Sequence, residues 1–222
     1  VVLHACCHNP TGADLDAAQW RDVVDIIGSR GLVPFIDIAY QGFADGIAED
    51  ALAVQLFAAA GQPFVVASPF SKSFSLYGER VGALSVVTAS RDESARVLSQ
   101  IKRIVRTNYS NPPTHGGAIV ATVLADAGLR HAWEDELGQM RQRILAMRLG
   151  LVERLENQGA KADFSFIVRQ RGMFSYTGLN AAQVDRLRDD FGIYAVSSGR
   201  ICLAALNSGN IDYVAKAIAA VS

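Results

Sequence analysis

The stretch FVVASPFSKSF, residues 64–74, decides the fold that we predict for this chain. Its first four residues form an aromatic and β-branched apolar run, which is typical of a buried strand. A lysine, Lys72, follows at once between hydroxyl and aromatic side chains. Because an ammonium group is costly to desolvate, a lysine at a strand end either extends along the surface to water, has a charged partner, or is placed there to react. The stretch alone leaves these alternatives open.

Strands and helices alternate on both sides of this stretch. Mostly apolar runs predict strands at residues 1–5, 32–38, 64–68 and 82–88. Helical spacing predicts helices between residues 14 and 31, with Asp14 or Asp16 as the N-cap, and at 49–60, 91–106, 116–127 and 129–158. A repeated strand–helix–strand order is typical of a parallel sheet covered by helices, so we predict an α/β fold.

The residues after Gly159 have a different character. Short apolar runs predict strands at 164–168, 174–177 and 194–206, with helices at 181–191 and 211–221. We therefore predict a large domain with a mostly parallel sheet, residues 1–139, and a smaller α+β C-terminal domain, residues 140–222. The boundary between them falls within the long predicted helix.

The composition limits the classes of protein to which the chain can belong. Half of the 222 residues are hydrophobic and the net charge is −1, which is typical of a globular protein and offers no basic surface for nucleic acid or an anionic membrane. No apolar run reaches the ~18–20 residues of a membrane span, and no signal peptide is visible. The three cysteines, Cys6, Cys7 and Cys202, fit reduced thiols in the cytoplasm better than a disulfide framework. Because Val1 already begins an apolar run, we expect the chain to start inside a longer protein.

Three of the predicted strands end in polar side chains. Asn9, Asp37 and Lys72 follow the first, second and third strands. In open α/β sheets, ligands bind beyond the carboxyl ends of the strands, so these side chains form a candidate site. Each is also compatible with a purely structural role: Asn9 suits a turn before a proline, and Asp37 suits a helix cap. Arg80, which follows the lysine stretch, suits a surface ion pair with Glu79.

A lysine, an aspartate and an arginine at such an edge can bind different groups of one ligand. The lysine amine can form a Schiff base with an aldehyde, and the arginine can hold a phosphate bidentately. The aspartate can pair with a protonated ring nitrogen. These are the requirements of pyridoxal 5'-phosphate, so the residues favour a site for that cofactor and no metal site is expected.

The motifs also occur in the order and at the spacing of a known family. NPTG at 9–12, DIAY at 37–40, SK at 71–72 and ERVG at 79–82 resemble the class I, fold-type I aminotransferases that depend on pyridoxal phosphate. CHNPTG at 7–12, AYQGF at 39–43 and NYSNPP at 108–113 narrow the resemblance to the aspartate/aromatic amino acid aminotransferase subgroup. The similarity extends from Val1 to the last helix. The stretches 74–87 and 170–176 look closer to the aromatic, or tyrosine, aminotransferase branch.

The resemblance implies roles in cofactor chemistry. Lys72 is implied to be the Schiff-base lysine and proton shuttle, and Asp37 the partner of the ring nitrogen. Tyr40 and Asn9 are implied to donate to the ring oxygen. The residues implied to bind the cofactor are Asn9, Asp37, Tyr40, Ser71, Lys72 and Arg80, of which Lys72, Asp37 and Tyr40 are implied to be catalytic.

The resemblance also implies how the substrate is held. Arg200, with Asn9, is implied to bind the α-carboxylate, and Arg106 is implied to reach the distal carboxylate in the site of a neighbouring subunit. The active unit would then be a homodimer with shared active sites. Both arginines are also compatible with structural positions: Arg200 suits the surface, although the uncharged residues after it predict a buried strand, and Arg106 suits the C-terminal end of a helix.

Two departures from the family pattern matter. Pro69 stands where relatives usually carry a hydroxyl that contacts the phosphate, which puts that contact in doubt. The family's N-terminal portion, with a phosphate-binding helix end, an aromatic residue stacked on the ring and a tyrosine from the partner, has no equivalent here. We therefore expect this chain to be part of an enzyme, and we expect it to bind the cofactor poorly alone.

The function implied is amino-group transfer between an aromatic amino acid, also aspartate, and 2-oxoglutarate, in cytoplasmic amino acid biosynthesis. Aspartate aminotransferase proper is the alternative, and the sequence leaves this choice open. An aminotransferase-like sensor domain of a regulator, which binds the cofactor without turnover, is an alternative from another class. A pyridoxal-phosphate lyase fits less well, because two substrate arginines suggest a dicarboxylate.

Overall fold

The structure, a computed structural model, describes all 222 residues, Val1–Ser222. The chain forms two compact units. The first unit contains Val1–Ala5, Leu15–Gly42 and Gly46–Leu137, and the second contains Cys6–Asp14, Phe43–Asp45 and Gly138–Ser222. The short segments Cys6–Asp14 and Phe43–Asp45 thus belong to the second unit although they lie early in the sequence. The assignment of domains to residues 1–139 and 140–222 stays a prediction.

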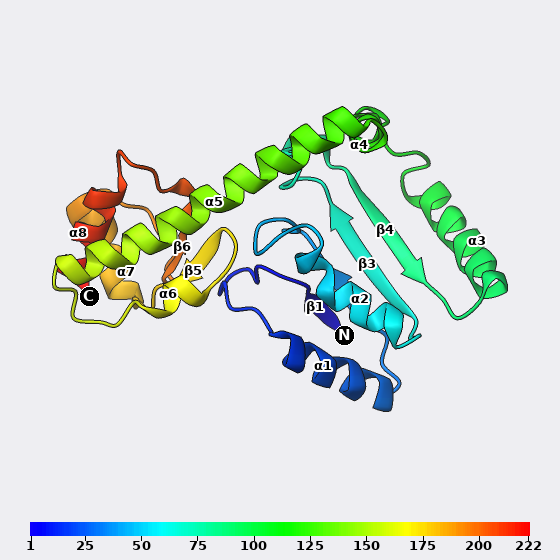
Figure 1. Ribbon diagram of the computed structural model, residues 1–222, viewed down its shortest axis with the longest axis horizontal. Helices are drawn as coiled ribbons and strands as arrows, with labels where there is room; N and C mark the ends of the chain where they lie inside the picture. Colours follow the sequence, from blue (N-terminus) through cyan, green and yellow to red (C-terminus); the bar gives the residue numbers. More distant parts are fainter. The chain divides into compact units, whose positions relative to one another are not determined.

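The first unit is built on a four-stranded sheet in the order β1-β2-β3-β4. The strands are β1 Val2–His4, β2 Phe35–Asp37, β3 Phe64–Pro69 and β4 Gly82–Val87. β1 pairs with β2 and β2 with β3 in parallel, whereas β3 and β4 are antiparallel (Figure 1). Asp37 is opposite His4 on one side and Ala67 on the other, so the carboxyl ends of the parallel strands lie side by side. The sheet is mostly parallel, as predicted.

The first two helices of this unit bury apolar residues. They are α1, Ala17–Ser29, and α2, Leu52–Ala59, which follows the 3₁₀ turn η1, Glu49–Ala51. Asp16, and not Asp14, begins α1: its carboxylate accepts the N–H groups of Ala18 and Gln19 at 2.8 and 2.9 Å. Such an N-cap stabilises a helix by ~1 kcal/mol. The fully buried members of the core include Ile36, Ala53, Phe57 and Phe64.

The remaining elements of the first unit lead into a long helix. They are the 3₁₀ turn η2 Tyr77–Glu79, α3 Arg91–Asn108, α4 His115–Ala125 and the first part of α5 Ala127–Asn157. No residue of α3 is buried, and its Leu98 and Ile104 are 49% and 63% exposed. None of the helices combines the length and the apolar character that a membrane crossing requires.

The second unit contains the rest of α5 and a small α+β arrangement. Its other elements are α6 Phe166–Arg169, β5 Phe174–Tyr176, α7 Ala181–Phe191, β6 Arg200–Cys202, the 3₁₀ turn η3 Leu203–Ala205, and α8 Ile211–Val221. β5 and β6 form an antiparallel pair in which Tyr176 is opposite Arg200. Leu151, Leu187 and Ile218 contribute buried side chains from three of its helices.

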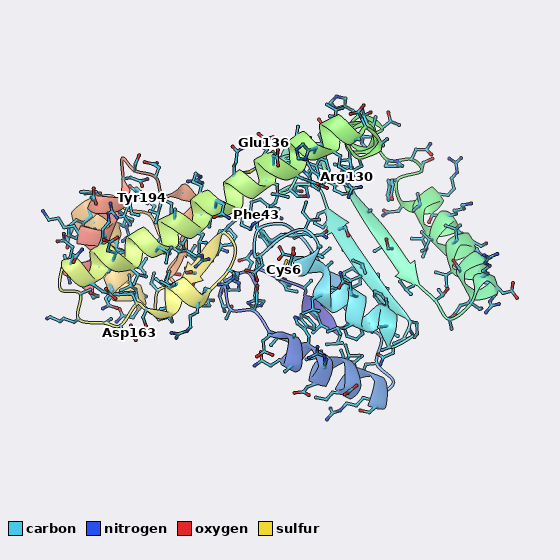
Figure 2. The ribbon with its side chains drawn as sticks, in the orientation of Figure 1. Cys6, Phe43, Arg130, Glu136, Asp163 and Tyr194 are labelled. Carbon is cyan, nitrogen blue, oxygen red and sulfur yellow. The ribbon has the colours of Figure 1, made fainter.

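Two strand predictions in this unit are wrong. The run at 164–168 contains the helical turn α6, because Asp163 accepts the N–H of Ser165 at 2.8 Å and so directs the backbone into a turn. The run at 194–206 is a strand only at Arg200–Cys202. Tyr194, at 83% exposure, lies in the loop before β6 (Figure 2), so the apolar composition of this run does not reflect burial.

Candidate functional site

Lys72 lies in a tight turn between β3 and η2, which we call the lysine turn, residues 70–76. Phe70 begins it by donating its N–H to Val81 O at 3.1 Å and accepts the N–H of Phe74 at 3.3 Å. Ser75, at φ +54°, donates its N–H to Lys72 O at 3.1 Å. The backbone is therefore fixed on both sides of Lys72, whose side chain is half-buried. The turn therefore fixes the point from which the Lys72 side chain extends.

The Lys72 side chain has an aromatic neighbour from another strand end. Its Nζ lies 5.0 Å from the centroid of the Tyr40 ring, and Tyr40 is buried. An ammonium group at this distance from a ring is attracted to the π face. Tyr40 follows β2 by three residues, so the sheet brings together two residues that the sequence placed in one site.

Trp133, which is far from the lysine turn in the sequence, packs against the turn and donates a hydrogen bond to it. Trp133, on α5, stacks on Phe74 with ring centroids 4.5 Å apart and an interplanar angle of 15°. Its indole N–H donates to Ser73 O at 2.7 Å. Sequence analysis missed this residue, because a contact across 60 positions leaves no local signal.

Asp37, Ser71 and Arg80 line one open hollow of about 370 Å³ in the first unit, together with Pro69. Asp37 is the last residue of β2, and its Oδ1 atom is buried without a hydrogen-bond partner. A buried carboxylate oxygen without a partner is costly, so this atom is suited to accept a proton or hydrogen bond from a ligand. A protonated ring nitrogen is such a donor. The residues present therefore fit the ring of pyridoxal phosphate.

Ser71 and Arg80 border the same hollow from the two sides of the lysine turn. Ser71 is buried, whereas Arg80 is exposed. Arg80 adopts a left-handed backbone, φ +52°, and its Nη1 donates to Tyr77 O at 2.9 Å. A hydroxyl and a guanidinium at one hollow suit a phosphate. Pro69 lines the hollow without a hydroxyl, so it supplies no side-chain donor to a phosphate.

The second unit holds Asn9, Phe174 and Arg200 together, and we call these three residues the Arg200 cluster. Arg200, the first residue of β6, donates from Nη1 to Asn9 Oδ1 at 3.0 Å. Its guanidinium lies 4.7 Å from the centroid of the Phe174 ring. Arg200 and Phe174 also line a mostly apolar hollow of about 240 Å³. A half-buried guanidinium with one nitrogen engaged keeps donors for a carboxylate.

Glycine at 199 permits the backbone that carries Arg200. Gly199 has φ +82°, and a Cβ there would lie 2.5 Å from Leu179 O. Its carbonyl accepts the N–H and hydroxyl of Thr177 at 3.0 and 2.8 Å. The turn before β6 therefore has no room for a side chain.

Arg106 is not among the residues that line the hollow at Asp37. It is exposed in the last turn of α3 and donates to the hydroxyl of Ser110. Its predicted contact with a substrate in a neighbouring subunit stays a prediction.

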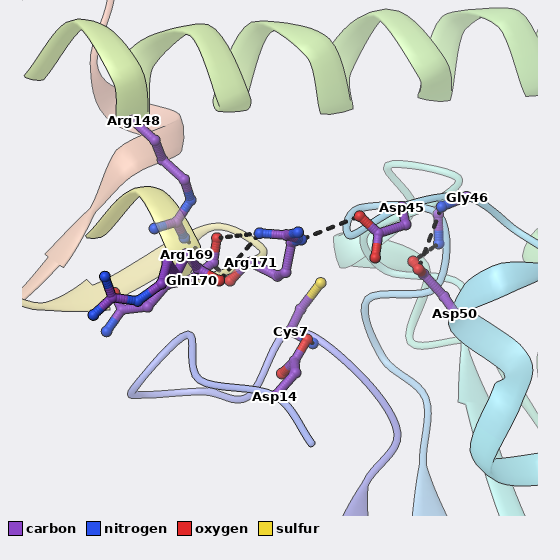
Figure 3. A network of polar contacts seen from close by, with 10 residues as sticks. Cys7, Asp14, Asp45, Gly46, Asp50, Arg148, Arg169, Gln170 and Arg171 are labelled. Carbon is purple, nitrogen blue, oxygen red and sulfur yellow. Dashed lines mark hydrogen bonds and ion pairs between the residues drawn. The ribbon is translucent and has the colours of Figure 1, made fainter. Parts of the chain in front are cut away.

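Arg148 is the other residue that sequence analysis missed. It is 1% exposed on α5, and Figure 3 shows its side chain extending from the helix toward the loop at residues 169–171. Burial, opposed in part by Cys7 and Asp14 and assisted by Arg171, lowers the pKa of Arg148 to about 10. The guanidinium therefore remains charged at neutral pH. Asp14, expected as a possible helix cap, instead accepts the N–H groups of Cys7 and His8 at 2.6 and 2.8 Å.

Nearly the whole chain matches one known protein family. Residues 1–218 match the family model of class I and II aminotransferases. The chain belongs to the class I and II aminotransferase family, and the predicted resemblance is confirmed.

The similar proteins include both aspartate aminotransferases and aromatic-amino-acid aminotransferases. The chain is 66% identical to an aspartate aminotransferase of Pseudomonas aeruginosa over 98% of its length, and 55% identical to an aromatic-amino-acid aminotransferase of Escherichia coli over its whole length. A crystal structure of an aromatic-amino-acid aminotransferase from Burkholderia pseudomallei, covalently bound to pyridoxal phosphate, matches 99% of the chain with a TM-score of 0.98 and 70% identity. The predicted fold class and subgroup are therefore confirmed. The chain spans 55–56% of the length of these proteins.

Proposed function

We propose that the whole protein is a pyridoxal-phosphate-dependent aminotransferase that moves an amino group between an aromatic amino acid, also aspartate, and 2-oxoglutarate. The observation that carries this proposal is the buried Asp37 Oδ1, which has no partner in a hollow that Ser71 and Arg80 also line. The covalently bound cofactor of the Burkholderia pseudomallei relative supports the same function.

The chain's own residues have separable tasks in this reaction. Lys72 would supply the amine that holds the cofactor through its aldehyde, and the same amine would move a proton at the substrate Cα, a step worth about 10²–10⁴-fold. Asp37 would keep the ring nitrogen protonated, while Tyr40 and Asn9 would donate to the ring oxygen. When bound, the cofactor supplies a ring that accepts the electron pair of the breaking Cα–H bond. Ser71 and Arg80 would hold its phosphate.

The substrate side of the proposal rests on the Arg200 cluster. Arg200 would bind the α-carboxylate, because its guanidinium is oriented by Asn9 and by the Phe174 ring. The apolar hollow beside it suits an aromatic side chain. Aspartate aminotransferase proper remains the second candidate, because a relative of that name is 66% identical. Rates with phenylalanine, tyrosine and aspartate as donors to 2-oxoglutarate, measured side by side, decide between them.

Replacing the lysine is the most direct test. Lys72→Ala should abolish the visible absorbance of the lysine-linked cofactor and nearly all turnover, because no other amine of the lysine turn can take its place. Lys102→Ala, at an exposed position of α3, is the matched control and should behave as the unmutated protein. Retention of both absorbance and turnover in Lys72→Ala would reject the assignment. If the unmutated protein bound the cofactor without turnover, the sensor-domain alternative would be favoured.

We further propose that the active unit is a cytoplasmic homodimer in which Arg106 serves the site of the neighbouring subunit. Arg106→Leu should then reduce kcat/KM for aspartate and glutamate about tenfold more than for phenylalanine, because only the former have a distal carboxylate. Arg103→Leu, one turn earlier on the exposed surface of α3, is the control. Equal losses for all three substrates would contradict the contact.

A further inference from the structure

Arg148 is a buried cation whose hydrogen bonds go to backbone carbonyls and one hydroxyl. Its Nη1 donates to Ile167 O at 3.1 Å and to Ser175 Oγ at 2.6 Å. Its Nη2 donates to the carbonyls of Arg171, Gly172 and Phe174 at 3.1, 2.6 and 2.8 Å. These acceptors span the segment from α6 into β5. The Arg148 side chain on α5 therefore binds acceptors at both ends and in the middle of the connection between α6 and β5.

Burying the Arg148 guanidinium costs desolvation free energy. A buried guanidinium loses its hydration, and carbonyl dipoles compensate it less fully than a carboxylate would. The Nε atom of Arg148 is also buried without a hydrogen-bond partner. An apolar side chain would avoid the unsatisfied Nε but would leave these five acceptors without the guanidinium donors, so the arginine serves here to hold the acceptors rather than only to fill space.

One branch of these contacts leads to Arg200. Phe174, whose carbonyl Arg148 holds, is the residue whose ring lies under the Arg200 guanidinium. Phe174 is also paired with Cys202 in the β5–β6 ladder, so the same strand supports the ring and the strand that carries Arg200.

The other branch leads to Asn9. Arg171, whose carbonyl Arg148 holds, donates its own N–H to Gly12 O at 2.7 Å, in the turn that contains Asn9. Gly172 packs against the start of that turn so closely that a Cβ on it would lie 2.4 Å from Cys7 Cβ. Arg200 and Asn9, which are hydrogen-bonded across 191 positions, are thus both supported by the α6–β5 connection that Arg148 binds.

We propose that Arg148 is a positioning residue for substrate recognition. It sets the distance and angle between Arg200 and Asn9 by binding four carbonyls of the α6–β5 connection, those of Ile167, Arg171, Gly172 and Phe174. This proposal rests on the proposed function, because it assigns the Arg200 cluster to the substrate carboxylate. Arg148 itself contacts neither substrate nor cofactor. It acts through Phe174 on one side and through the Gly12 turn on the other.

The test measures carboxylate binding in the whole protein without turnover. The ligand is 3-phenylpropionate, which has the phenylalanine skeleton and no amine, and the comparison ligand is 3-phenylpropan-1-ol, which has no carboxylate. Arg148→Met should weaken 3-phenylpropionate about tenfold in calorimetry, because charged bidentate contacts depend steeply on geometry. Binding of the alcohol should not change, and the lysine-linked cofactor should still form and give its visible absorbance. Arg154→Met, on the same helix but paired with Asp212, should leave both affinities unchanged.

Unchanged binding of 3-phenylpropionate by Arg148→Met, or an equal loss for both ligands, would overturn the positioning role. If Arg148→Met does not fold, Arg148→Lys takes its place: one ammonium cannot serve acceptors spread from residue 167 to 175, so a loss of about threefold for the carboxylate alone is expected, and none would overturn the proposal. An unmutated protein without cofactor absorbance would reject the proposed function instead.

Discussion

The lysine turn and the Arg200 cluster are built in opposite ways. The backbone hydrogen bonds that shape the lysine turn join near neighbours along the chain, the widest linking Phe70 to Val81. The Arg200 cluster depends on a hydrogen bond across 191 positions. The first is a local structure that its own sequence specifies. The second exists only when remote segments of the second unit have packed, which requires a buried support such as Arg148.

This difference predicts which step of the reaction each region controls. Damage near the lysine turn should change the chemical step, whereas damage to the support of the Arg200 cluster should change carboxylate binding. Under the proposed function, kcat and carboxylate affinity therefore report on the two regions separately.

The largest expected effect is on the side of the lysine turn. Asp37→Ala should lower kcat by about 10²–10³-fold, because a charge placed to stabilise the developing transition state is lost. Its Oδ1 has no partner in the chain, so thermal unfolding of the cofactor-free protein should not become easier. The affinity for 3-phenylpropionate should also be unchanged. Asp37→Asn is the control that keeps the shape and removes the charge.

A near-normal rate in Asp37→Ala would reject the ring-nitrogen role. A parallel loss of carboxylate affinity would mean that the lysine turn and the Arg200 cluster do not act separately, and kcat and affinity would no longer distinguish them.

The same contrast explains how much of the molecule could be predicted from its sequence. The strand before Lys72, the strand ending at Asp37 and the family itself follow from short ordered motifs, because local propensity and spacing carry that information. Trp133 and Arg148 could not be found in this way. Their roles come from contacts with distant backbone atoms, which leave no periodic pattern in the sequence.

The wrong strand at 164–168 has a related cause. An apolar run predicts burial, but the choice between strand and helix was made by Asp163, whose side chain binds the N–H of Ser165. The run at 194–206 was shortened by the turn at Gly199, whose closeness to Leu179 O depends on the fold.

The next effect tests the packing that the Arg200 cluster requires. Gly199→Ala should destabilise the second unit by roughly 2–3 kcal/mol, since a left-handed alanine costs about 1–2 kcal/mol and a Cβ would overlap a backbone oxygen. Gly178→Ala is the matched control, because Gly178 has φ +80° and nothing within 4 Å of its added Cβ. Urea unfolding of both variants separates backbone strain from overlap. Equal losses would show that Leu179 moves aside and that the turn tolerates a side chain.

The smallest effect is expected at Trp133, the remote residue that donates a hydrogen bond to the lysine turn. Trp133→Phe keeps a ring to stack on Phe74 but removes the N–H that binds Ser73 O, so unfolding should become easier by about 1 kcal/mol. If the turn is a local structure, its own backbone bonds still hold Lys72, and cofactor absorbance and kcat should change by less than about twofold. A much larger loss would mean that Trp133 supports Lys72 as Arg148 is proposed to support Arg200. Both regions would then depend on remote side chains of α5, and local sequence would explain neither.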